Sequence, residues 1–220
     1  MSAKYEYSGE ISKGTDMARV NKQYREDAKE RIITAAIEVA VENGWDALTL
    51  DAIAQNVGVT IPALYSYFRN VDALREEVVF KVLRNNLANV EATLTRKGDI
   101  YQNIQDYADL IFVHQKQYAN ILSNLPLKFL KDPGQREKIA PFFRTSSIII
   151  RDCLARAQSR GEIPLQVDPN EAARLIASIT VGLQLSSMFI ETADENAEKS
   201  LWIEGVERIL LIDRHSESMR

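Results

Sequence analysis

The stretch "NVGVTIPALYSYFRN", residues 56–70, contains a helix stop, a helix start and two tyrosines within a short distance. Gly58 supplies the left-handed backbone that ends a helix, and Thr60 supplies a side-chain oxygen that can cap the next one. Pro62 falls in the first turn of that next helix, where a missing backbone N–H costs nothing. The stretch therefore predicts a tight turn followed by a helix of about two turns.

Two further helices are predicted just before this turn. Apolar residues recur at helical spacing over Glu26–Asn43, and Gly44 follows them as a stop. Thr49 can cap a second helix over Leu50–Val57, which Gly58 ends. The order of helix, glycine turn and short helix is typical of a helix-turn-helix, whose second helix lies in the major groove of DNA.

The short helix has two chemically different faces. Leu64 and Phe68 are four residues apart and are expected to pack on the two preceding helices. Tyr65 lies on another face, where a tyrosine ring can contact thymine methyls or sugars and its hydroxyl can reach a phosphate. Tyr65 and Tyr67 therefore either contact DNA or complete a small core, and the spacing leaves both interpretations open.

The rest of the chain also reads as helical. Asn70 can cap a long helix from Val71 to about Thr95, and five or so further helices follow, the last two over Pro169–Thr192 and Glu195–Ile212. No strand alternation is sustained. We predict an all-α fold of about nine helices, with a flexible extension at residues 1–22, a three-helix DNA-binding domain at 23–70 and a second helical domain at 71–220.

Composition excludes several classes of protein. The net charge is −4, and the seven basic residues from Arg19 to Arg75 are matched by eight acidic ones, so there is no generally basic coat. One cysteine and two histidines leave little material for a metal site, a disulfide or histidine-based catalysis. No catalytic motif is apparent, no targeting segment is visible, and the longest uncharged stretch is too short and too polar for a membrane span. We expect a cytoplasmic protein that is not an enzyme and needs no cofactor.

The first 22 residues mix both charge signs with Ser, Gly and Thr. They are either a frayed tail or the start of an arm in which Arg19, Lys22 and Arg25 touch DNA phosphates or enter a minor groove.

The run from Ala28 to Val79 resembles the DNA-binding domain of TetR-type (tetracycline-repressor-like) transcriptional regulators. The matching segments are "IITAAIEVAVENG", "LTLDAIAQNVGVT" and "ALYSYF" with a following "DAL". This resemblance implies that Thr49 contacts a backbone phosphate and that the recognition helix supplies the base- and phosphate-facing residues. Those residues are Thr60, Ile61, Pro62, Ala63, Tyr65 and Tyr67.

One position departs from the family pattern. Many relatives carry a lysine just after the recognition helix, where this chain has Val71, preceded by Arg69 and Asn70. Either Arg69 makes the phosphate contact instead, or DNA binding is weaker than is usual in the family.

The resemblance also implies an effector pocket and a dimer interface in the C-terminal domain. Aromatic residues there suit a lipophilic ligand, although each could equally belong to the core. The predicted pocket residues are Phe112, His114, Gln115, Tyr118, Phe143, Ser147, Gln184 and Met188. The apolar helix Pro169–Thr192 and the helix after it are predicted to form a twofold four-helix bundle, through Ala177, Gly182, Trp202, Val206 and Ile209.

These inferences favour a homodimeric, ligand-responsive repressor that binds a palindromic DNA operator and leaves it when a small, largely apolar effector binds. The alternative is a constitutive or architectural DNA-binding protein without an effector, which would have a filled core in place of the pocket. The sequence identifies neither the effector nor the operator, and it does not separate repression from activation.

Overall fold

The computed structural model describes residues 10–118, 121, 131–186 and 196–212. These residues form eight α-helices, with short 3-10 and π-helical turns and no β-strand among them. The all-α prediction is confirmed, and the number of helices in the described part is close to the predicted nine. The chain divides into two compact units, Met1–Val78 and Val79–Arg220.

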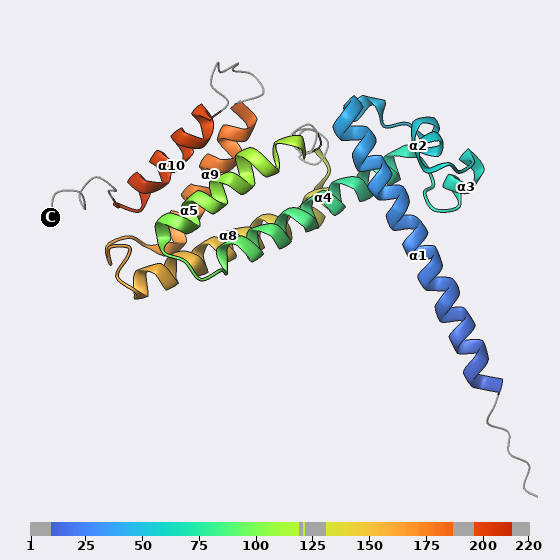
Figure 1. Cartoon of the computed structure of the whole chain (residues 1–220), viewed down its shortest axis with the longest axis horizontal. Helices are drawn as coiled ribbons and strands as arrows, with labels where there is room; N and C mark the ends of the chain where they lie inside the picture. The colour runs from blue at the N-terminus through green and yellow to red at the C-terminus, as the bar shows by residue number, and fades with distance from the viewer. Residues whose placement is uncertain (1–9, 119–120, 122–130, 187–195, 213–220) are drawn as a thin grey trace, which may run out of the picture. The chain divides into compact units, whose positions relative to one another are not determined.

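The first unit contains α1 (Glu10–Asn43), α2 (Leu50–Val57), α3 (Ile61–Tyr65) and the first residues of α4 (Val71–Leu94), with a 3-10 turn, η1 (Trp45–Ala47), between α1 and α2 (Figure 1). Helix α2 contacts both α1 and α3. The buried side chains of this unit come from all four helices, so α2 and α3 sit on a common core. Its buried apolar residues include Ile33, Ala36, Leu48, Ile53, Leu64, Phe68, Leu74 and Val78.

Local signals at the helix ends act as the sequence predicts. Gly44 and Gly58 have φ angles of 89° and 73°, in the left-handed region that favours glycine. The Thr49 hydroxyl oxygen accepts a hydrogen bond from the Ala52 N–H at 3.2 Å, which fixes the start of α2. The Asn70 side chain accepts one from the Ala73 N–H at 2.8 Å at the start of α4. The predicted bounds of α2 are confirmed.

Helix α1 begins earlier than the sequence predicts. The expected start was Glu26, whereas the helix runs from Glu10. No proline interrupts this segment, and an exposed ion pair between Lys22 and Glu26 adds weak support at 3.9 Å. The apolar stripe appears only where the helix reaches the core, so periodicity alone missed the first part. Residues 1–9 and the Arg19 side chain lie outside the described residues.

The second unit contains the rest of α4, α5 (Ile100–Asp109), α8 (Pro133–Ser159), α9 (Pro169–Ser186) and α10 (Ala197–Ile209). Helix α9 packs against both α8 and α10, and α10 also packs against α5 (Figure 1). A π-helical turn, η2 (Leu110–His114), and a 3-10 turn, η3 (Lys116–Tyr118), continue α5. The predicted ends at Thr192 and Glu195 lie outside the described residues.

The cap residue of α5 and a side chain that follows α8 together fix the start of α5. The Asp99 carboxylate caps the helix by accepting a hydrogen bond from the Gln102 N–H at 2.8 Å. The Glu162 carboxylate accepts one from the Ile100 N–H at 2.8 Å, and its hydrogen bond with Arg160 lowers the pKa of Glu162. These bonds set the position of α5, whose inner face lines the cavity described below.

Candidate DNA-binding site and effector cavity

The start of α3 is fixed by its own sequence. The Thr60 hydroxyl oxygen accepts a hydrogen bond from the Ala63 N–H at 3.4 Å, and Pro62 occupies the first turn. A threonine that accepts in a cap keeps its O–H for donation, so Thr49 and Thr60 retain a donor that suits a phosphate oxygen. Both residues are exposed.

Burial separates the two faces of α3 as predicted. Leu64 is fully buried and Phe68 is 3% exposed, whereas Tyr65 is 54% exposed. Tyr67 lies between these extremes and is half-buried. Tyr65 is therefore not part of the small core. The other predicted contact residues on α3 and its exit, Ile61, Pro62, Ala63 and Arg69, are partly or fully exposed.

Arg25 lies against the exit of α3. Its guanidinium donates a hydrogen bond to the Ser66 carbonyl oxygen at 2.8 Å and stands 5.8 Å from the centre of the Tyr67 ring. Arg25 and Tyr67 are predicted from sequence as separate DNA contacts, whereas in the structure they also contact each other. They are 42 positions apart in the sequence, so no local pattern indicates the pair.

The exposed position of Tyr65 leads to a direct prediction. We expect Tyr65→Ala to weaken binding to an operator by about 1–3 kcal/mol, because the side chain stands free of the core and faces outward from the short helix. The free energy of unfolding should change by less than about 0.5 kcal/mol. Fluorescence anisotropy measures the first quantity and urea denaturation the second.

Tyr24→Ala is the matched control for this experiment. Tyr24 is also strongly exposed in the first unit, but it is outside the predicted contact set. Equal loss of affinity in both variants, or unfolding of the Tyr65 variant, would contradict the assignment of Tyr65.

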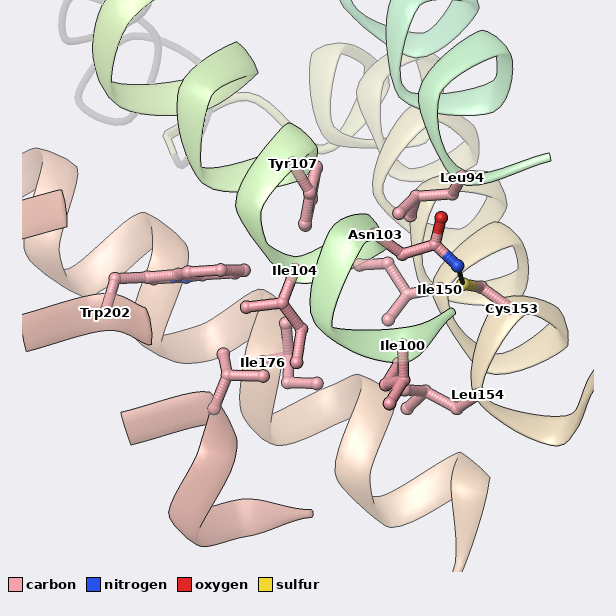
Figure 2. Close-up of a pocket in the computed structure, with 11 residues that line it drawn as sticks. Leu94, Ile100, Asn103, Ile104, Tyr107, Ile150, Cys153, Leu154, Ile176 and Trp202 are labelled. Atoms are coloured by element: carbon pink, nitrogen blue, oxygen red, sulfur yellow. Dashed lines mark hydrogen bonds between the residues drawn. The ribbon is translucent and has the colours of Figure 1, made fainter. Parts of the chain in front are cut away.

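A cavity lies inside the second unit, between α5, α8, α9 and α10 (Figure 2). Its volume is about 20 Å³, enough for about one water molecule. Figure 2 shows Trp202 and Ile176 on one side of it and Cys153 and Asn103 on the other. The full lining is Leu94, Ile100, Asn103, Ile104, Tyr107, Ile150, Cys153, Leu154, Ile176, Trp202 and Val206.

The polar groups around this cavity are neutral and mostly paired. The Asn103 side-chain amide donates to the Cys153 sulfur at 3.6 Å. Burial raises the pKa of Tyr107 to about 12, although a hydrogen bond with Ser146 opposes this shift. Burial also raises the pKa of the Cys153 thiol. At neutral pH the cavity therefore presents no charge and suits apolar chemistry.

None of the predicted pocket residues is among those that line this cavity. The Phe112 ring lies 6.2 Å from the ring of Trp202, which lines the cavity. His114 and Phe143 are exposed, and Tyr118, Ser147 and Gln184 are half-buried. Gln115 is buried and accepts a hydrogen bond from Asn86 at 2.8 Å. Met188 lies outside the described residues.

Two residues predicted for the dimer interface belong instead to the core of their own chain. Trp202 and Val206 are each 1% exposed and pack within the main core of the second unit. The Trp202 indole N–H donates to the Thr180 hydroxyl oxygen at 2.8 Å, and its ring meets Tyr107 edge-on. Ala177 and Ile209 pack beside the same core and are half-buried, whereas Gly182 is exposed.

Within the described ranges, no group of three or more His, Cys, Asp or Glu side chains is placed to hold a metal ion. None of the described helices is both long and apolar enough to span a bilayer.

Comparison with known proteins identifies the N-terminal helices. Residues 32–78 match the family model described as bacterial regulatory proteins of the tetR family, and this range covers most of the α1 to α4 core. The chain is 28% identical over 170 residues to the HTH-type transcriptional regulator SrpR of Pseudomonas putida, covering 76% of this chain and 78% of that protein. The chain belongs to the TetR family. It is a DNA-binding transcriptional regulator, and its curated relatives are named as regulators rather than enzymes.

Other relatives match this TetR-family regulator in sequence or in fold over most of its length. The regulator UidR of Escherichia coli is 23% identical over 159 residues, covering 70% of this chain and 78% of UidR. A TetR-family regulator from Mesorhizobium loti has the same fold, with a TM-score of 0.70, 17% identity and coverage of 85% and 96%. FadR of Bacillus subtilis, solved in complex with stearoyl-CoA, gives a TM-score of 0.64 at 19% identity, with coverage of 82% and 97%.

Proposed function

We propose that the protein is a cytoplasmic, ligand-responsive repressor that binds a palindromic operator as a homodimer and is released by a small, largely apolar effector. The observation that carries the DNA-binding part is the division of α3 into a buried face and an exposed one. Leu64 and Phe68 anchor the helix, and Tyr65 is left free on its outer side.

The proposed DNA contacts follow from that division. Residues of the first turn of α3 and Tyr65 face base edges, because they are the exposed part of a helix that the core holds at its other side. Threonine hydroxyls and the Arg69 guanidinium bind backbone phosphates. These contacts position the helix but do not distinguish one base sequence from another. The proposed contact set is Thr49, Thr60, Ile61, Pro62, Ala63, Tyr65, Tyr67 and Arg69.

The proposed dimer interface lies on the exposed side of α9. Leu175, Val181 and Leu185 are 52%, 47% and 44% exposed there, and Gly182 lies beside them. Such an apolar face is unusual on a free surface. Pairing of two copies across a twofold axis would cover it and place two recognition helices about 34–36 Å apart, as a palindromic site requires.

The apolar cavity supports the proposed class of effector. Its lining includes Trp202, Tyr107 and several isoleucines, with the Asn103 amide as a polar group. Drug-sized ligands need pockets of about 300–1,000 Å³, so an effector must push the lining helices apart. The related fold of FadR was solved with stearoyl-CoA, a ligand with a long apolar chain. Such opening would couple effector binding to the DNA-bound state of the dimer.

Capture and sequencing of genomic DNA fragments tests the proposal most directly. The purified protein should retain a few fragments that share an inverted repeat, and the Tyr65→Ala variant should retain them weakly. Genes next to the retained fragments indicate the chemical class of effector to try. Retention of fragments without a common inverted repeat would contradict sequence-specific regulation by a dimer.

A cavity-filling variant tests the effector site. We expect Ile176→Phe to keep operator binding but to need at least about tenfold more of a releasing compound, since Ile176 lines the cavity and overpacking there costs about 1–3 kcal/mol. The compounds tested are substrates of the proteins encoded beside the operator. Ala155→Phe adds a ring on the exposed side of α8 and serves as the control. An equal response of both variants would place the effector elsewhere.

The small size of the cavity favours a second candidate function, a constitutive or architectural DNA-binding protein. A core with room for about one water molecule needs no ligand to be stable. In that case no compound would release the wild-type protein from its operator, although Tyr65→Ala would still weaken binding.

A further inference from the structure

The exit of α3 depends on contacts from outside the helix. Helix α3 has only five residues, and the turn after it is closed by hydrogen bonds from the Tyr67 and Phe68 N–H groups to the Leu64 carbonyl oxygen, at 2.9 and 3.0 Å. A helix this short has little stability of its own. Its direction is therefore set by the side chains that hold its two ends.

Two cationic residues of α1 hold this exit. Arg25 stands over the Tyr67 ring at 5.8 Å, and Lys29, one turn further along α1, stands over the Phe68 ring at 5.7 Å. Both distances fall within the range of favourable cation–π contacts. Lys29 also pairs with Glu77 in the first residues of α4. Consecutive rings thus lie against consecutive turns of α1.

The hydrogen bond of Arg25 adds a specific constraint. Its guanidinium donates to the Ser66 carbonyl oxygen at 2.8 Å, just beyond the last residue of α3. Carbonyl groups at this end of a helix lack helical partners and carry partial negative charge, so a cation there is favourable. Among the described residues, Arg69 has no hydrogen-bond or ion-pair partner, although it is only three positions further along the chain.

We propose that Arg25 is a positioning residue that locks the exit of the recognition helix through Ser66 and Tyr67, and that Arg69 is the cation that contacts DNA phosphate. The proposal rests on the assignment of α3 as the DNA-reading helix. In this arrangement Arg25 contributes to operator affinity by holding Tyr65 and its neighbours in the orientation that fits the groove.

The salt dependence of operator binding separates the two roles. The slope of log K against log salt is negative, and loss of one phosphate contact reduces its magnitude by about 0.9. We expect Arg69→Ala to show that change on any DNA sequence. Arg25→Ala should weaken operator binding about tenfold with an unchanged slope, because it loses a cation–π contact and one hydrogen bond rather than a counterion-releasing contact. If the magnitude of the slope falls by about 0.9 in Arg25→Ala, Arg25 is itself a phosphate contact and the proposal is overturned.

Amide hydrogen exchange gives a readout that needs no DNA. In Arg25→Ala, the Tyr67 and Phe68 amides should exchange at least about tenfold faster than in the wild-type protein, whereas the exchange of α2 amides should be unchanged. Arg25→Lys keeps the charge but loses the planar group, so it should restore little of the protection. Unchanged exchange in Arg25→Ala would also overturn the proposal. If the wild-type protein binds no operator, the proposed function fails, and the exchange experiment still decides whether Arg25 holds the helix exit.

Discussion

Trp202→Ala is expected to lower the free energy of unfolding by about 3–5 kcal/mol. The side chain is 1% exposed and touches the rings of Tyr107 and Phe112, with centroid distances of 5.5 and 6.2 Å. Its truncation leaves a large hole beside an existing cavity and removes the hydrogen bond to the Thr180 hydroxyl oxygen. Both effects have the same sign, so this substitution should be among the most damaging in the second unit.

Chemical denaturation at fixed protein concentration measures this loss, and two variants divide it into parts. Trp202→Phe keeps an aromatic ring but loses the indole N–H, so it should cost roughly half as much or less. Ser200→Ala changes an exposed neighbour on α10 and should shift the free energy of unfolding by less than about 0.5 kcal/mol. A Trp202→Ala protein that is as stable as the wild type but monomeric would return Trp202 to the dimer interface.

The helix-turn-helix could be predicted from sequence because its signals are local. Gly58 needs a positive φ, Thr49 and Thr60 cap the helices that follow them, and Leu64 and Phe68 share one face at a spacing of four. Each signal acts within a few residues of the bond it makes. The bounds of α2 and the burial on α3 were therefore predicted correctly without knowledge of the rest of the chain.

The packing of the helices in the second unit could not be predicted in the same way. Periodicity shows that Trp202 and Val206 lie on an apolar stripe, but it does not show whether that stripe faces its own chain or a second copy. The structure resolves this, because α10 packs on both α5 and α9 and buries the stripe internally. Helix α9 is apolar nearly all round, and this property correctly indicated that the described part of the chain leaves one of its faces uncovered.

The cavity and the Arg25 contact depend on residues far apart in the sequence. Asn103 was the one available signal for the cavity, since this polar residue interrupts an apolar stripe that includes Ile100, Ile104 and Tyr107. A buried amide among such neighbours indicates either a structural hydrogen bond or a ligand contact. Its partner, Cys153, is 50 positions away, and only the packing of α5 on α8 brings the two together.

The exposed face of α9 leads to the second large effect, which concerns the proposed dimer. We expect Gly182→Arg to convert the protein to monomers at micromolar concentration and to weaken operator binding by at least about 100-fold. A Cβ atom at Gly182 would meet no atom within 4 Å, so the subunit itself can accept a larger residue. At a twofold seam, however, the two introduced arginines would face each other among Leu175, Val181 and Leu185. Burying two like charges without partners costs several kcal/mol.

Gly182→Ala is the matched control, since it adds one methyl group in the same open space and no charge. It should remain dimeric by sedimentation velocity and bind the operator with nearly wild-type affinity. Val206 is unsuitable for this test, because an arginine there would enter the core of the subunit and unfold it. The loss of DNA affinity in Gly182→Arg should occur although every proposed DNA contact is intact, since a monomer can engage only one half of a palindromic site. A Gly182→Arg protein that sediments as a dimer would show that the two copies meet through another face.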